Sequence, residues 1–135
     1  MNIDKEKKFV NKYIMKKKRE RILYELSIPS KRIDALSRFC HNYEMYIDER
    51  KIMYSGKEVS DEALKKLIKK SSNEIEGYMI CWDERYDSKD MTLECAIDIM
   101  KEDGMCMIFI SEDICIISTE QTQGPKEIVM LRNIM

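Results

Sequence analysis

The chain has 135 residues, with 24 Lys and Arg against 25 Asp and Glu, and a formal net charge of −1. That length fits one domain over residues 1–135, and 44% apolar residues are enough for a packed core, which excludes wholesale disorder. No apolar run is long enough for a membrane span, and the first residues lack the apolar segment of a secretion signal. Five cysteines stand singly, which indicates reduced thiols. We therefore expect a cytoplasmic protein with no membrane partner.

Charge is divided unevenly along the chain. Residues 1–70 hold 19 Lys and Arg against 11 Asp and Glu, whereas residues 71–135 hold 5 against 14. Such asymmetry indicates a surface for an acidic partner or a nucleic acid. The simpler interpretation is that the lysines are solvated surface, or that the two halves attract each other within one fold.

The first helix is expected from about Asp4 to Ser27, because Pro29 disfavours helical geometry in the residue before it. Its apolar pattern changes side along the way. At about 100° per residue, the stripe formed by residues 9, 10, 13 and 14 lies opposite that of residues 22, 23 and 26. One straight helix cannot bury both stripes against one surface. The pattern predicts either a kink near 16–20 or a second stripe that faces another chain.

Three shorter helices are expected after it. One runs over 31–43 with Ser30 as its N-cap, one over 61–71, and one from Leu93 to the Asp103-Gly104 stop. The apolar spacing in the first of them predicts a buried stripe of five residues: Ile33, Leu36, Phe39, Cys40 and Tyr43.

Strands are expected mainly in the second half. The apolar runs over 77–82, 105–110 and 114–117 are typical of strands covered on both faces, and residues 111–113 predict a hairpin turn. Residues 127–131 add a strand after Gly124-Pro125, and residues 45–54 give a short edge pair. The run over 105–110 is expected in the centre, because so apolar a segment would aggregate at an edge. The expected fold class is α+β: a mainly antiparallel sheet from the C-terminal half with about four helices, the N-terminal ones packed on one face.

Few residues point to catalysis. His41 is the only histidine, which excludes metal sites built on two or more histidines. It adjoins Cys40, but neighbours on a helix do not face each other, so Cys40 is expected in the core rather than in a catalytic pair. The chain has no CxxC motif and no glycine-rich nucleotide loop. We therefore assign no catalytic residue and expect no metal and no cofactor.

Carboxylates give the one remaining catalytic alternative. Four of them crowd the loop after the strand predicted over 77–82: Asp83, Glu84, Asp87 and Asp90. Oxygen ligands are what Mg²⁺ prefers, but the loop lacks the ligand order of a calcium-binding EF-hand, and basic residues dilute its charge. A solvated loop is the simpler interpretation. A small enzyme or magnesium-dependent hydrolase that uses His41 or residues 83–90 is the least favoured function.

The favoured function is a non-catalytic protein-binding module. Tyr, Trp and Met are common at interface cores, and the second apolar stripe of the first helix has to be buried against another surface. Small bacterial antitoxin or immunity-type proteins have this general character, by composition only. An acidic partner protein is expected on the first helix, and the acidic loop is expected to be a second surface: Tyr13, Lys17, Arg21 and Tyr24, then Asp83, Glu84 and Asp87. A homodimer formed through the second stripe is the other partner that fits.

Nucleic-acid binding is the alternative function. The basic residues between 12 and 21 can follow phosphates, and Tyr13 and Tyr24 can stack on bases of open strands. The pI of about 6.0 and the absence of a known nucleic-acid-binding motif argue against it.

Overall fold

The computed structural model describes residues 1–57, 60–71, 76–102, 107–111, 113–119 and 127–132. Within these ranges the α-helices are α1 (Ile3–Tyr13), α2 (Arg19–Ser27), α3 (Pro29–His41), α4 (Asp61–Ser71) and α5 (Leu93–Glu102). The strands are β1 (Ile52–Lys57), β2 (Glu76–Ile80), β3 (Lys89–Thr92), β4 (Met107–Ile110), β5 (Ile114–Ser118) and β6 (Glu127–Arg132). The α+β class, with strands mostly from the C-terminal half, is therefore confirmed.

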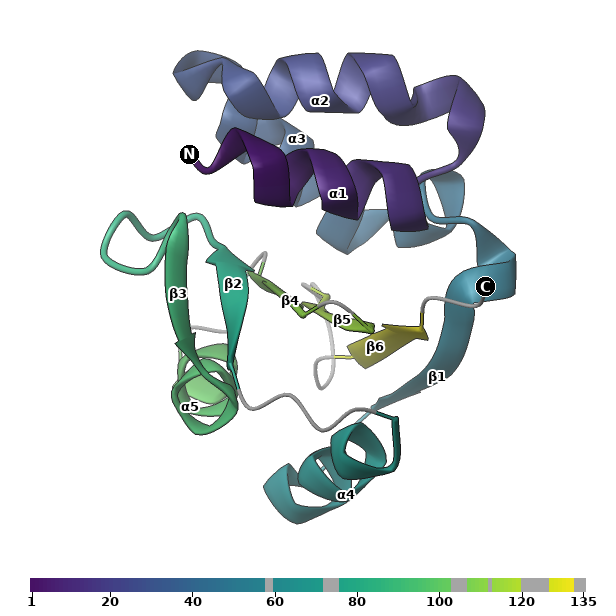
Figure 1. Cartoon of the computed structure of the whole chain (residues 1–135), viewed down its shortest axis with the longest axis vertical. Coiled ribbons are helices and arrows are strands. Elements are labelled where there is room, and N and C mark those ends of the chain that lie inside the picture. Colours follow the sequence, from purple (N-terminus) through teal and green to yellow (C-terminus); the bar gives the residue numbers. More distant parts are fainter. Residues whose placement is uncertain (58–59, 72–75, 103–106, 112, 120–126, 133–135) are drawn as a thin grey trace.

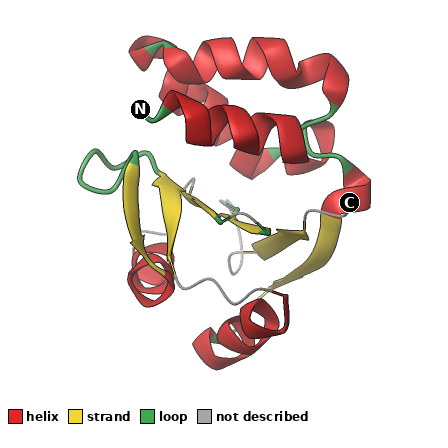
Figure 2. Cartoon of the chain, viewed as in Figure 1, coloured by secondary structure: helices red, strands yellow, loops and turns green. Residues whose placement is uncertain are grey.

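The elements form three layers (Figure 1). Helices α1, α2 and α3 cover one face of a six-stranded antiparallel sheet, and α4 and α5 lie on the opposite side (Figure 2). The strand order is β1-β6-β5-β4-β2-β3, so β4 lies in the interior of the sheet as its apolar sequence predicts. Strands β4 and β5 pair as the expected hairpin, with Phe109 opposite Ile116.

The sheet separates two apolar cores. Side chains alternate along a strand, so Tyr78 and Ile80 of β2 pack towards α1–α3, while Met79 between them packs towards α4 and α5. The same alternation continues along β4 and β5. The middle strands read as unbroken apolar runs because both of their faces are covered.

The expected single helix over 4–27 is wrong. The helix ends at Tyr13, a 3-10 turn occupies Lys16–Lys18, and α2 starts at Arg19. Because the chain reverses there (Figure 1), both apolar stripes reach the same core, with Phe9 at 0% and Ile22 at 2% exposure. The expected kink is therefore the correct alternative. The stripe that a second chain was expected to cover is covered within this chain.

Tertiary contacts explain where the first helix stops. The amide of Met15 donates to the carbonyl of Tyr46 at 2.8 Å, and the amide of Asp48 donates to the carbonyl of Tyr13 at 2.9 Å. Ile14 forms a bridge with Ile47. Backbone groups that leave a helix need other partners, and residues 46–48 provide them. No pattern in the local sequence indicates these partners, which lie 31 residues (Met15 to Tyr46) and 35 residues (Tyr13 to Asp48) further along the chain.

Other expectations need smaller corrections. Helix α3 begins with Pro29 in its first turn and Ile28 as N-cap, so Ser30 lies inside the helix rather than capping it. Ile33 is 55% exposed instead of buried. Residues 45–54 do not form an edge pair, because β1 begins at Ile52 and pairs with β6. The predicted stop at Asp103-Gly104 and the break at Gly124-Pro125 lie outside the described residues.

Strand β3 was not expected. Residues 89–92 pair antiparallel with β2 and form the edge strand on that side of the sheet. Among the described residues, no helix combines the length and the apolar character needed to cross a membrane.

Replacement of Gly77 by Ala should destabilise the fold by about 1–3 kcal/mol. A Cβ atom there would lie 2.4 Å from Cζ of Phe109 and 2.6 Å from the carbonyl oxygen of Ile110, which is backbone and cannot move aside. Gly56→Ala is the matched control, because its Cβ would meet the hydroxyl end of Tyr54, a side chain that can rotate away. Urea denaturation of both variants measures the free energy of unfolding. Equal losses of that free energy for Gly77→Ala and Gly56→Ala would contradict the role of the backbone contact at Gly77.

Candidate functional site

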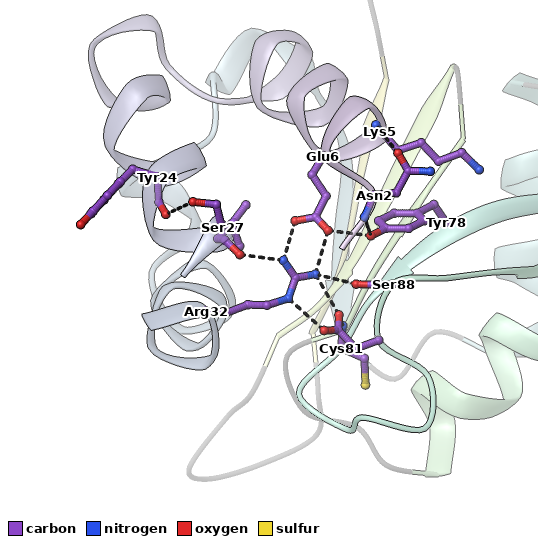
Figure 3. A network of polar contacts seen from close by, with 11 residues as sticks. Asn2, Lys5, Glu6, Tyr24, Ser27, Arg32, Tyr78, Cys81 and Ser88 are labelled. Carbon is purple, nitrogen blue, oxygen red and sulfur yellow. Dashed lines mark hydrogen bonds and ion pairs between the residues drawn. The ribbon is translucent and has the colours of Figure 1, made fainter. Parts of the chain in front are cut away.

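A buried ion cluster joins three separate segments (Figure 3). Arg32 of α3 donates from Nη1 and Nη2 to the two carboxylate oxygens of Glu6 in α1, at 2.6 and 2.9 Å. It also donates from Nε and Nη2 to the carboxylate of Asp87, at 2.9 and 3.0 Å. Glu6 is fully buried and Arg32 is 9% exposed. Bidentate pairing of this kind fixes the orientation of the guanidinium relative to the carboxylates and also neutralises their charge.

Further polar groups complete the cluster. The Tyr78 hydroxyl donates to Glu6 at 2.6 Å and accepts from the amide of Asn2 at 3.0 Å. Nη1 of Arg32 also donates to the carbonyl of Leu26 at 3.0 Å, and Nη2 lies 3.3 Å from Oγ of Ser88. Every side-chain nitrogen of Arg32 thus faces an acceptor within the protein. The cluster is closed, so its guanidinium is not offered to a ligand.

The pKa values in the cluster follow from these contacts. Burial by itself would lower the pKa of Arg32, but the hydrogen bonds and charges of Glu6 and Asp87 outweigh it and raise that pKa above its usual value. Burial, followed by the hydrogen bond to Glu6, raises the pKa of Tyr78 to about 12. Arg32 stays charged and Tyr78 stays protonated across the ordinary pH range.

Most carboxylates of the acidic loop (residues 83–90) contact other groups of the protein. Asp87 belongs to the ion cluster and also accepts from the amide of Cys81 at 3.1 Å. Asp83 is bound by the side chain and amide of Arg85. Asp90 pairs with Lys5 across to α1. Of the predicted second surface, Glu84 is exposed, whereas both carboxylate oxygens of Asp87 accept from Arg32.

In the described part of the chain, these placements do not bring together a set of metal ligands. No group of three or more His, Cys, Asp or Glu side chains that could hold a metal ion occurs there. His41 lies exposed at the last residue of α3, with Nδ1 2.8 Å from the carbonyl of Ser37. It is nine residues from Arg32, or roughly 13 Å along the helix. Cys40 is buried as expected, at 1% exposure.

Basic side chains gather at the start of α2. A hollow of about 410 Å³ lies between α2, α3 and the segment before β1, lined by Lys17, Lys18, Arg21, Ile22, Glu25, Arg38 and Tyr46. It adjoins a second hollow of about 490 Å³, lined by Arg21, Glu25, Lys31, Asp34, Ser37 and Arg38. We call the two hollows together the α2–α3 groove. The first hollow carries four basic residues against one acidic residue.

Glu25 organises this groove. It is 7% exposed, accepts from Nε of Arg21 at 3.2 Å, and pairs with Nη2 of Arg38. Burial by itself would raise the pKa of Glu25, but the hydrogen bonds and charges of Arg38 and Arg21 outweigh it and lower that pKa. One buried carboxylate therefore holds two guanidinium groups at the groove.

Sequence reasoning located part of this surface. Lys17 and Arg21 line the groove, and the Tyr24 side chain is 55% exposed beside it, with the ammonium of Lys31 5.3 Å from its ring centroid. Tyr13 is fully buried, so it packs in the core rather than on the surface. The contribution of Arg38 from α3 was missed, because only the packing of α3 on α2 brings it to the groove.

Replacement of Arg32 should lower the stability of the fold strongly. Arg32→Met leaves the Glu6 carboxylate buried without its partner, and we expect the free energy of unfolding to fall by about 3–5 kcal/mol. Adding Glu6→Gln should recover part of this loss, because it removes the stranded charge. Arg85→Met, which breaks the pair of a 69% exposed arginine with Asp83, should cost less than about 1 kcal/mol. Urea denaturation distinguishes these cases, and similar losses for Arg32→Met and Arg85→Met would contradict the role of the cluster.

Alkaline pH should weaken the same cluster through Tyr78. Between pH about 10, where a phenol ionises in the unfolded chain, and about 12, the unfolded chain releases this proton and the folded protein retains it. The free energy of unfolding then falls as pH rises, so this contribution is complete below pH 10 and is lost by pH 12. Comparison of wild type and Tyr78→Phe by urea denaturation at pH 9 and 11.5 should show their difference shrinking. A constant difference would contradict the raised pKa.

No protein-family model matches the chain, and neither a curated protein nor a solved structure matches it. The contacts and charges of the molecule itself are therefore what supports a function. Four basic side chains facing one hollow of the α2–α3 groove are the starting point.

Proposed function

We propose that this protein is a non-catalytic, cytoplasmic binding module that docks an acidic segment of another protein in the α2–α3 groove. The observation that carries the proposal is the convergence of four basic side chains on one hollow of about 410 Å³: Lys17, Lys18, Arg21 and Arg38. With Glu25 as the one acidic residue of its lining, this hollow has a net charge of +3. Complementary charge of this kind speeds association and selects the partner.

Contacts within the protein order the basic side chains of the groove before a partner binds. Glu25 fixes Arg21 and Arg38, and the ammonium of Lys18 lies 5.2 Å from the ring centroid of Tyr46. Side chains that are ordered before binding lose less conformational entropy when the partner arrives. Arg21 remains 79% exposed, so its charge is accessible.

A protein partner fits this surface better than a nucleic acid. Glu25 and Asp34 lie among the basic residues of the groove and interrupt the continuous basic surface that a phosphate backbone needs, whereas an acidic peptide can place its carboxylates opposite the basic residues alone. Tyr24 and Ile33 add exposed apolar area on the same two helices, each at 55% exposure. Arginine and tyrosine side by side are typical of energetically important positions in protein interfaces.

The cytoplasmic location in the proposal rests on the thiols. Cys95 and Cys115 are free thiols, and the five cysteines stand singly along the sequence, without paired spacing. Burial raises the pKa of Cys115 well above its usual value, which makes this thiol unreactive.

Charge reversal in the groove should weaken binding of an acidic peptide. We expect the double variant Lys17→Glu and Arg21→Glu to bind a fluorescein-labelled oligoglutamate peptide about tenfold more weakly than wild type, because two favourable charge contacts become repulsive. Fluorescence anisotropy at low salt measures this. Lys66→Glu with Lys69→Glu on α4, across the sheet, makes the same change of net charge and should leave the affinity unchanged.

A labelled single-stranded DNA oligonucleotide of equal length distinguishes the alternative function. Tighter binding of DNA than of the peptide, with an affinity that falls steeply as salt rises, would assign the groove to nucleic acid. An affinity for the peptide that survives the Lys17 and Arg21 reversal would remove the groove from the binding surface. Thermal unfolding followed by circular dichroism confirms that each variant is folded.

A further inference from the structure

The two arginines of the α2–α3 groove come from different helices and meet at one carboxylate. Nε of Arg21 in α2 donates to Oε1 of Glu25 at 3.2 Å, and Nη2 of Arg38 in α3 donates to Oε2 of the same residue. The two guanidinium groups are therefore held beside each other at one point of the groove. Such an arrangement suits a phosphate group, because the planar fork of a guanidinium matches the spacing of two phosphate oxygens.

The contacts within the protein leave the groove positively charged. Glu25 is the one acidic residue that lines the first hollow, and the net charge of +3 already includes it. Both oxygens of Glu25 accept from arginines. The Arg21 side chain is 79% exposed and the Arg38 side chain is 37% exposed, so a ligand can contact both guanidinium groups.

Two lysines add to this positive wall from a third segment. Lys17 and Lys18 belong to the 3-10 turn before α2 and line the same hollow. The ammonium of Lys18 lies 5.2 Å from the ring centroid of Tyr46, a contact that keeps it at the hollow. Basic groups thus reach the hollow from the turn, from α2 and from α3. Donors that come from several directions fit a tetrahedral group with three terminal oxygens better than a planar carboxylate with two.

We infer that the α2–α3 groove recognises a phosphorylated serine or threonine within the acidic segment of its partner. The inference rests on the proposed function, because it names the chemical group that the groove selects in that segment. A phosphorylated side chain carries a charge of about −1.5 to −2 at neutral pH, whereas a glutamate carries a single negative charge. The larger charge is the closer match to a hollow with a net charge of +3. Phosphorylation of the partner therefore controls how tightly it docks.

The test compares three fluorescein-labelled peptides of five residues by fluorescence anisotropy. All three have glutamate at the four outer positions, and the central residue is phosphoserine, glutamate or serine. We expect the phosphoserine peptide to bind about tenfold more tightly than the glutamate peptide, because its extra charge and third oxygen add charge-assisted hydrogen bonds. The serine peptide should bind most weakly. Inorganic phosphate should displace the labelled phosphoserine peptide only at about 100-fold higher concentration than the unlabelled peptide does, because it lacks the flanking carboxylates.

Variants that conserve charge separate recognition of the phosphate from attraction between charges. Arg21→Lys with Arg38→Lys keeps the net charge but removes both guanidinium forks. The phosphoserine peptide should therefore lose about tenfold in affinity and the glutamate peptide only about twofold. Arg50→Lys with Arg85→Lys is the matched control, because both of these arginines also pair with a carboxylate but neither lines the groove. The control should leave both affinities unchanged. The ratio of the two affinities on one variant is independent of the fraction of folded protein.

The possible failures of the inference and of the proposed function are distinguishable. Equal binding of the phosphoserine and glutamate peptides overturns the inference and leaves the docking of an acidic segment in place. An unchanged ratio of the two affinities in the Arg21 and Arg38 variant also overturns it, because the preference is then one of charge alone. Inorganic phosphate that competes as well as the unlabelled peptide assigns the site to free phosphate instead. If none of the three peptides binds, the proposed function fails together with the inference.

Discussion

The buried pairing of Arg32 with Glu6 and Asp87 is the interaction on which the rest of the structure depends. It connects α1, α3 and the loop between β2 and β3, three segments that are distant in sequence. A buried charge without its partner is strongly unfavourable, so these segments hold one another in a single arrangement. Ser88, next to Asp87, has a φ of 64°, in the left-handed region that residues other than glycine rarely adopt. Its hydroxyl lies beside Arg32, so the cluster holds this turn in place.

The candidate binding surface follows from that arrangement. The cluster fixes α1 and α3 relative to the sheet. It thereby positions α3, whose Arg38 meets Arg21 of α2 at Glu25. The α2–α3 groove formed in this way carries both signs of charge, as a protein interface does.

Much of the fold follows from local pattern. Strands β2, β4 and β5 are recognisable because burial on both faces leaves an unbroken apolar run, and α4 is predicted with its observed ends, Asp61–Ser71. Strand β3 escapes prediction because its pattern is polar and its strand geometry comes from pairing with β2. The same limit applies to the sites. Lys17 and Arg21 are visible as a basic stretch of sequence, but no sequence pattern pairs Arg32 with a glutamate 26 residues before it.

The sequence by itself determined the secondary structure of the apolar segments, the α+β class and the presence of a basic surface in the first helical region, because these depend on periodicity and composition. The tertiary structure alone decided the rest. The chain reverses after Tyr13 because residues 46–48 accept and donate the backbone hydrogen bonds that a continuing helix would have used. That reversal buries Tyr13 and both apolar stripes. Asp87 is drawn inward because Arg32 is there to neutralise it, and long-range partners of this kind leave no local trace in the sequence.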